Sequence, residues 1–330
     1  MNIKKDEFLE IKQEILNTIK AYDTIIIHRH IRPDGDCMGS TLGLRSILRN
    51  SFPNKRIFSA GYDTVKYLDF LGKEDVVPEE YYQDALVIVV DTSNASRIAG
   101  GNYNKGKELI KMDHHIETEK YGMINYVRES FPSTSILIMD FFETFKSELK
   151  MDVEGARALY VATITDTGRF RYNSVNGDTL RLAGNMLDYG FNTDDIYANL
   201  HIKDKEILKL QGYVLNHFKT SPNGVSYIYL NERIQKKFGV SNEDASALVN
   251  VLDSIRGSLI WILFIDIEGV IRVRLRSRYT GVVEIAQRYN GGGHFQASGA
   301  MAKNKHEMRQ MVKEADEALR LYKLEHKEVF

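Results

Sequence analysis

The sequence predicts an α/β protein of two domains: a doubly wound, mostly parallel sheet, followed by a smaller α/β domain with a mixed sheet. Three apolar runs, Thr24–Ile27, Ala85–Val90 and Leu109–Met112, are each followed by His or Asp, and helical stretches separate them. Buried parallel strands read as continuous apolar runs, and ligands bind beyond their carboxyl ends. The pattern restarts after the turn Ser221–Gly224, and 330 residues are too many for one average domain.

The remaining elements follow in chain order. The chain opens with an amphipathic helix, because Phe8, Ile11, Ile15 and Ile19 fall on one face. Helical patterns recur at 39–48, 154–163, 193–218, where a break is possible, and 242–255. A strand is predicted at 225–230, and two more strands, 258–265 and 270–275, are predicted to form a hairpin. A helix with Met308 and Met311 on its apolar face comes last. We place the first domain at 1–190, a helical linker at 191–223 and the second domain at 224–330.

Charge and composition exclude several classes of protein. The formal net charge of −1 creates no overall field for binding long duplex nucleic acid, although local cations can still hold a small phosphate. The single cysteine, Cys37, excludes an internal disulfide framework. No apolar leader follows the first residues, and the longest apolar runs are shorter than the ~20 residues of a membrane span. We expect a soluble, cytoplasmic protein without a membrane partner.

Acids and histidines gather in four segments. These are His28–Asp36, Val90–Asn94, Asp113–His115 and Thr165–Arg169. Imidazole and carboxylate without thiolate suit divalent ions such as Mn²⁺, Mg²⁺ or Zn²⁺, and clustered carboxylates repel one another unless cations lie among them. The candidate ligands are too many for one ion and fit two: His30, Asp34, Asp36, Asp91, His114 and Asp166. Two ions that share a bridging water are the usual arrangement for hydrolysing a phosphoester.

Each segment alone has a simpler interpretation. Asp91 and Asp166 could be helix caps, and an isolated His-x-x-x-Asp is common. Ser133-Thr134-Ser135 could be a helix N-cap. The four segments together, each at a predicted sheet edge or helix end, favour the metal site.

The four segments resemble the motifs of the DHH phosphoesterase superfamily, which is named for the Asp113-His114-His115 type of motif. Asn290–Gly299 resembles the glycine-rich signature of the DHH-associated C-terminal domain. The resemblance covers nearly the whole chain. Within the superfamily, length and motif spacing are similar to the bacterial oligoribonuclease group, whose members also dephosphorylate 3′-phosphoadenosine 5′-phosphate.

This resemblance implies roles for the metal-site residues. His30, Asp34 and Asp91 would hold one ion, and Asp36, Asp91, His114 and Asp166 would hold the other, with Asp91 as the bridge. The family usually uses Mn²⁺. His115 would contact the scissile phosphate and protonate the leaving group, and Asp113 would orient a histidine. His28 lies outside the motif and is expected either to be structural or to orient a metal ligand. Ser133-Thr134-Ser135 also resembles a stretch of hydroxyls that lines the site in relatives.

The glycine run exposes backbone amides to an anion, although alone it would favour a mobile loop. The resemblance implies instead that Gly292, Gly293 and His294 bind substrate, with His294 reaching into a cleft between the domains. Upstream, Arg272, Arg274, Arg276 and Arg278 share one face of a predicted strand. Arg276 and Ser277 match a substrate-binding pair of the family, Arg278 is a further candidate, and a solvent face explains the other two arginines.

The sequence therefore predicts a metal-dependent hydrolase acting by two-metal activation of a bridging water. Its substrates would be short single-stranded oligoribonucleotides, cleaved to mononucleotides, and 3′-phosphoadenosine 5′-phosphate. A phosphodiesterase for linear or cyclic dinucleotide messengers is the main alternative. A RecJ-like single-strand exonuclease and a non-catalytic nucleotide-binding regulator are the others. Relatives are often dimers, so a homodimer stays open.

Overall fold

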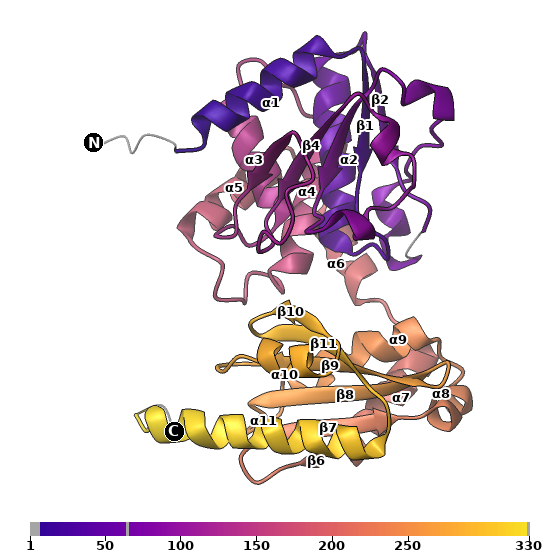
Figure 1. Cartoon of the computed structure of the whole chain (residues 1–330), viewed down its shortest axis with the longest axis vertical. Helices are drawn as coiled ribbons and strands as arrows, with labels where there is room; N and C mark the ends of the chain where they lie inside the picture. Colours follow the sequence, from indigo (N-terminus) through magenta and orange to yellow (C-terminus); the bar gives the residue numbers. More distant parts are fainter. Residues whose placement is uncertain (1–6, 64–65, 329–330) are drawn as a thin grey trace. The chain divides into compact units, whose positions relative to one another are not determined.

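The computed structural model describes residues 7–63 and 66–328, and it divides into two compact units, 1–201 and 202–330 (Figure 1). The opening residues 1–6, on which the expectation of no leader rests in part, lie outside the described residues. The predicted limits of the domains and linker stay predictions. No helix among the described residues is long and apolar enough to cross a membrane.

The first unit is built on a five-stranded parallel sheet in the order β2-β1-β3-β4-β5. Its strands are β1 (Thr24–His28), β2 (Arg56–Ala60), β3 (Leu86–Val90), β4 (Glu108–Asp113) and β5 (Ile124–Val127). Every residue of β1 and β3 is buried, which explains their continuous apolar runs. The strand order reverses between β1 and β3, and this switch point is where open α/β sheets bind ligands.

Helices cover one face of this sheet and form the main core with it. They are α1 (Leu9–Ala21), α2 (Gly35–Ser51), α3 (Thr134–Thr144), α4 (Val153–Asp166), α5 (Gly177–Leu187) and α6 (Thr193–His201). A smaller apolar cluster, which includes Ile26 and Val87, lies on the other face under short 3-10 turns and loops. The 3-10 segments of this unit are η1 (Lys66–Leu71), η2 (Glu79–Tyr81), η3 (Ala95–Arg97) and η4 (Tyr103–Lys105).

The second unit has a six-stranded mixed sheet in the order β10-β11-β9-β8-β7-β6, in which only β7 and β8 pair in parallel. Its strands are β6 (Lys219–Thr220), β7 (Val225–Leu230), β8 (Ile260–Ile267), β9 (Val270–Ser277), β10 (Gly292–His294) and β11 (Ala297–Ala302). Its helices are α7 (Lys205–His217), α8 (Glu232–Phe238), α9 (Asn242–Ala247), η5 (Leu248–Leu252), α10 (Val283–Arg288) and α11 (Lys305–Glu325). The predicted fold class, a parallel sheet followed by a mixed one, is confirmed.

Two predicted helices differ in detail. The pattern over 193–218 breaks at 202–204 into α6 and α7, and the pattern over 242–255 becomes a short α-helix followed by the 3-10 segment η5. The short strands β2 and β5 were not predicted, because each has polar residues and lacks a long apolar run. They lie at the two edges of the sheet, where burial is incomplete.

The close approach of α2 and α4 generates a prediction about two helical glycines. A Cβ at Gly39 of α2 would lie 2.3 Å from the Ala158 carbonyl oxygen, whereas a Cβ at Gly184 of α5 would meet nothing within 4 Å. G39A should therefore destabilise the protein by about 1–3 kcal/mol. G184A should stabilise it by about 0.4–1 kcal/mol, because the unfolded chain loses freedom. Urea unfolding of both variants measures this, and equal effects would contradict the close packing.

Candidate metal centre

The predicted metal ligands come together at the carboxyl edge of the parallel sheet. His30 follows β1, Asp91 follows β3, and His114 follows β4. Asp34 and Asp36 lie at the N-terminus of α2, and Asp166 is the last residue of α4. Because β1, β3 and β4 are neighbours in the sheet, residues far apart in sequence become adjacent here.

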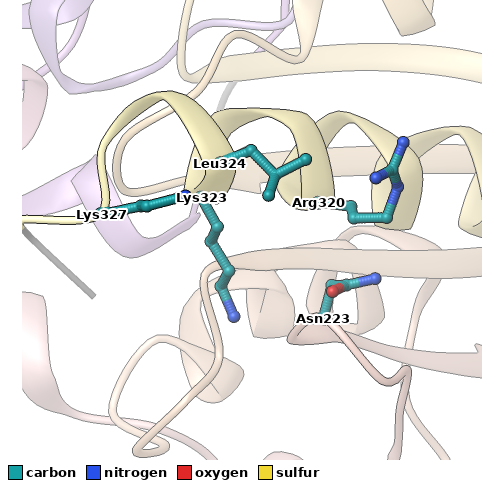
Figure 2. A pocket seen from close by; sticks show the side chains of 5 residues that line it. All are labelled: Asn223, Arg320, Lys323, Leu324 and Lys327. Atoms are coloured by element: carbon teal, nitrogen blue, oxygen red, sulfur yellow. The ribbon is translucent and has the colours of Figure 1, made fainter.

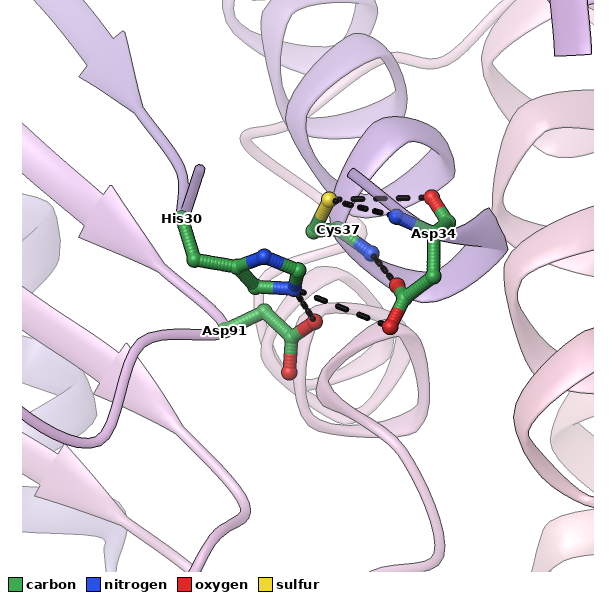
Figure 3. A group of neighbouring side chains, drawn as sticks. All are labelled: His30, Asp34, Cys37 and Asp91. Atoms are coloured by element: carbon green, nitrogen blue, oxygen red, sulfur yellow. Dashed lines mark hydrogen bonds and ion pairs between the residues drawn. The ribbon is translucent and has the colours of Figure 1, made fainter. Parts of the chain in front are cut away.

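One group forms around His30 (Figure 3). Its Nε2 lies 3.7 Å from Asp34 Oδ2 and 3.5 Å from Asp91 Oδ2. Its Nδ1 is 2.9 Å from the Ile31 carbonyl, so the ring donates there and turns Nε2 toward the carboxylates. Cys37 belongs to the same group, and burial raises the pKa of its thiol to about 12. A protonated, buried thiol is unreactive, so Cys37 packs against its neighbours.

A second group forms around His114. Its Nε2 lies 3.6 Å from Asp91 Oδ1, 3.8 Å from Asp36 Oδ2 and 3.4 Å from Asp166 Oδ2. Its Nδ1 is 3.2 Å from the Phe131 carbonyl oxygen. Asp91 therefore presents Oδ2 to His30 and Oδ1 to His114, which is the position that a bridging ligand needs.

The carboxylates of these groups cannot all be ionised without compensating charge. Burial, followed by the charge of Asp91, raises the pKa of Asp36 well above its usual value. Burial and the charges of Asp34 and Asp91 do the same to the pKa of Asp166. Burial alone would also raise the pKa of Asp91, but the hydrogen bond from His30 and the nearby histidines hold it below its usual value. The repulsion among these acids favours cations in their midst.

The donor set fits divalent ions. Ligand bonds of about 2.1 Å at angles of about 90–110° place neighbouring ligand atoms about 3.0–3.4 Å apart. The histidine–carboxylate distances of 3.4–3.8 Å are slightly wider and need only small side-chain movements to close. Imidazole nitrogen with several carboxylate oxygens suits Mn²⁺ and similar ions.

The N-terminus of α3 donates hydrogen bonds to the acids of the site, and the sequence alone did not decide between this role and helix capping for its hydroxyl residues. Ser133 caps the helix by accepting from the Ile136 amide. Thr134 donates its hydroxyl to Asp91 Oδ1 at 3.0 Å and its amide to Asp36 Oδ2 at 2.7 Å, and the Ser135 amide donates to Asp36 Oδ1 at 3.1 Å. Ser133 is thus a cap and Thr134 is part of the site. A helix N-terminus also favours the negative charge of Asp36.

His115 is oriented by Asp113. His115 Nδ1 lies 2.8 Å from Asp113 Oδ1, which also accepts from the backbone amides of His114 and His115. Burial would lower the pKa of His115, but the hydrogen bond to Asp113 and the nearby carboxylates raise it to about 9. The ring is thus oriented through Nδ1, which donates to Asp113.

His28 lies outside these metal-binding groups. Its Nδ1 is 2.8 Å from the Ala99 carbonyl, and its Nε2 is 3.0 Å from the Tyr82 hydroxyl. The ring is buried and joins β1 to the loops on the other face of the sheet. The expectation of a structural role agrees with these contacts.

The predicted substrate residues lie in the second unit, where β10, β11 and the end of β9 meet. Gly293 has φ +140°, and a Cβ there would come within 2.6 Å of the Ala297 carbonyl oxygen, so the hairpin of Gly292 and His294 requires glycine at this position. The Ser277 hydroxyl donates to the Thr280 carbonyl and stabilises the turn after β9.

The arginines near this hairpin are anchored by backbone carbonyls. Arg276 donates to the Leu275 carbonyl at 2.9 Å, and Arg278 donates to the Ser258 carbonyl at 3.1 Å and lies over the Trp261 ring. The structure thus brings the predicted substrate residues together in one unit and the metal ligands together in the other.

A surface pocket of the second unit contains none of the predicted site residues. Figure 2 shows its lining, Asn223, Arg320, Lys323, Leu324 and Lys327, beside the C-terminal end of α11. Arg320 forms an ion pair with Glu317, and the amide of Asn223 donates to Asp316, so neighbouring acids offset this basic lining.

Comparison with known proteins supports both the N-terminal metal-site motifs and the C-terminal glycine-rich motif. Residues 24–163 match the DHH family, N-terminal domain, and residues 224–321 match the DHHA1 domain. The chain is 38% identical to the bifunctional oligoribonuclease and PAP phosphatase NrnA of Bacillus subtilis, over 88% of this chain and 93% of that protein. It is 40% identical to a probable protein of the same name from Streptococcus mutans, over 87% and 92% of the two chains.

Among solved structures, an exopolyphosphatase-related protein from Bacteroides fragilis matches with a TM-score of 0.88 and 25% identity. The match covers 96% of this chain and all of the other.

The buried His28 predicts a loss of stability in mild acid. Burial lowers its pKa from 6.5 to about 4 in the folded state. As the pH falls from 6.5 toward 4, the unfolded chain binds a proton here and the folded chain does not, so stability decreases through this window. The two pKa values correspond to about 3 kcal/mol.

Thermal unfolding between pH 7 and pH 4 measures this loss in the wild type and in H28N, which can still donate to Ala99 but cannot be protonated. H28N should show a flatter pH dependence, and H306N, at an exposed histidine, should behave as the wild type. Parallel curves for H28N and the wild type would contradict the assignment.

Proposed function

This chain belongs to the DHH family and carries a DHHA1 domain, and we propose that it hydrolyses short oligoribonucleotides to mononucleotides and dephosphorylates 3′-phosphoadenosine 5′-phosphate in the cytoplasm. The family makes it a phosphoesterase. The observation that carries the proposal is Asp91, whose two oxygens face two separate histidine–carboxylate groups. The two relatives described above, whose names state both activities, support the choice of substrates.

We assign two divalent ions, Mn²⁺ foremost, to these groups. His30, Asp34 and Asp91 would hold one, and Asp36, Asp91, His114 and Asp166 the other. When bound, such a pair supplies a water nucleophile at neutral pH and neutralises phosphoryl charge. The protein holds its ligands in place through Thr134, which donates to both Asp91 and Asp36.

His115 is the candidate general acid. Its Nδ1 is engaged by Asp113, so Nε2 is the atom that can give a proton to the leaving oxygen. Although burial alone would lower the pKa of the ring, the hydrogen bond to Asp113 and the nearby carboxylates raise it, which favours the protonated form that a general acid requires. Asp113 cannot easily turn away, because two backbone amides also donate to the same carboxylate oxygen.

The second unit would bind the rest of the substrate. The amides of Gly292 and Gly293 and the ring of His294 can contact phosphate, and Arg276, Ser277 and Arg278 can contact the other end of the nucleotide. The backbone contacts of Arg276 and Arg278 limit their freedom, which reduces the entropy lost on binding. A formal charge near zero agrees with short rather than long nucleic acid.

The test is an assay of purified protein with Mn²⁺ on ribonucleotides of two to five residues. 3′-Phosphoadenosine 5′-phosphate, a linear diadenylate with a 5′-phosphate and pyrophosphate are assayed in parallel. We expect turnover of the short RNAs and the bisphosphate, and loss of both activities with a chelator. Hydrolysis of the messenger dinucleotide alone, or of pyrophosphate alone, would refute the proposed substrates and leave the phosphoesterase assignment in place.

Substitutions in the two units should separate metal binding from substrate binding. D91N removes the bridging charge and should lower kcat at least 1000-fold together with Mn²⁺ affinity measured by calorimetry. H294A should raise KM about 10-fold or more while Mn²⁺ affinity stays unchanged, because His294 lies in the other unit.

The exposed residues Asp188 and His306 provide matched controls, as D188N and H306A. Both should retain wild-type kinetics and Mn²⁺ binding. Equal loss of Mn²⁺ from D91N and H294A would contradict this division of roles.

A further inference from the structure

A lysine is buried beside Asp113, the residue that orients His115. Lys111 lies in β4, and its side chain is 0% exposed. Its Nζ donates to the carbonyls of Ser93 and Glu119, each at 3.0 Å, and lies 4.9 Å from the centre of the Tyr121 ring. A buried ammonium group is costly unless acceptors and an opposite charge surround it.

The opposite charge is Asp113. Lys111 and Asp113 are two residues apart on one strand and therefore point to the same face of the sheet. Lys111 Nζ lies 3.6 Å from Asp113 Oδ2. That oxygen is buried and has no hydrogen-bond partner among the described residues, whereas Oδ1 accepts from His115 and two amides. Lys111 thus supplies the positive charge on the side of Asp113 that faces away from His115.

The same amino group connects the loops that carry the site. Ser93 is two residues beyond Asp91, and Glu119 is in the loop that follows His115. The Tyr121 hydroxyl, from a residue whose ring lies beside Lys111, donates to the Thr92 carbonyl at 2.6 Å. One buried cation therefore contacts the loop after β3, the side chain of Asp113 and the loop after β4.

We infer that Lys111 is a positioning residue for the phosphoesterase reaction: it holds the carboxylate of Asp113, which in turn holds His115 in the orientation that protonates the leaving group. Lys111 itself touches no reacting atom. The inference rests on the proposed function and adds a residue that acts through Asp113. A lysine that serves folding alone would make the same contacts, so the test must separate catalysis from stability.

K111Q is the informative variant, because glutamine can still donate to Ser93 or Glu119 but carries no charge. We expect kcat to fall about 10- to 100-fold with KM within about twofold of the wild type. K111R, which keeps the charge, should recover at least part of the loss. The matched control is K12Q: Lys12 is equally buried in the same unit and pairs with Asp140. K12Q should lower the unfolding temperature without lowering kcat.

A double-mutant cycle with D113N shows whether the effect passes through Asp113. In the D113N background, K111Q should lower kcat less than threefold further. Full additivity of the two substitutions, or a wild-type kcat for K111Q, would refute the inference. No turnover by the wild-type protein would instead refute the proposed function.

A measurement that needs no substitution of Lys111 covers the case in which K111Q does not fold. A ¹⁵N–¹H spectrum selective for lysine amino groups should contain a slowly exchanging NH₃⁺ signal at neutral pH that is absent from D113N. Persistence of the same signal in D113N would show that Lys111 does not depend on Asp113 and would overturn the inference.

Discussion

The structure of the site depends on Asp91, which two histidine–carboxylate groups share. Its backbone has φ 53°, a left-handed conformation that is uncommon for a residue with a side chain, and its carboxylate is buried. This conformation directly after β3 turns the two oxygens toward His30 and His114. Strain of this kind is found where function requires a geometry that local preferences oppose. The hydroxyl of Thr134 holds one of these oxygens in place.

Placing so many acids together requires positive charge, and the fold supplies part of it. The N-terminus of α3 gives two amides to Asp36, and Asp34 caps α2 through the Cys37 amide. Lys111 lies beside Asp113 on the same face of the sheet. Helix N-termini and a buried lysine reduce the repulsion among the acids, and bound cations would account for the remainder. The ends of these helices therefore help to stabilise the negative charge of the site.

In the proposed function, the first unit holds the metal ions and the second unit binds the nucleotide. The parallel sheet brings the ends of neighbouring strands to one edge, which suits the collection of metal ligands. The second unit presents the glycine hairpin of Gly293 and His294 beside Arg276, whose strand β9 pairs with β11. Hydrolysis of a nucleotide phosphoester by this proposal needs both a cation site and a site that binds the nucleotide. Separate units allow each to vary without disturbing the other.

The sequence by itself determined the fold class, because continuous apolar runs that end in acids or histidines identify parallel strands and their binding edge. The family followed from the resemblance of the Asp113-His114-His115 segment and the glycine run to known motifs. The sequence also singled out His30, Asp91 and His114, because imidazole and carboxylate side chains are common metal ligands. Only the tertiary structure decided that Thr134 touches Asp91 and that Lys111 faces Asp113. A threonine at a helix start and a lysine in a strand have no distinctive pattern. Thr134 reaches Asp91 from another part of the chain, and Lys111 is buried because the carbonyls of Ser93 and Glu119 accept from it, and local sequence encodes neither set of contacts.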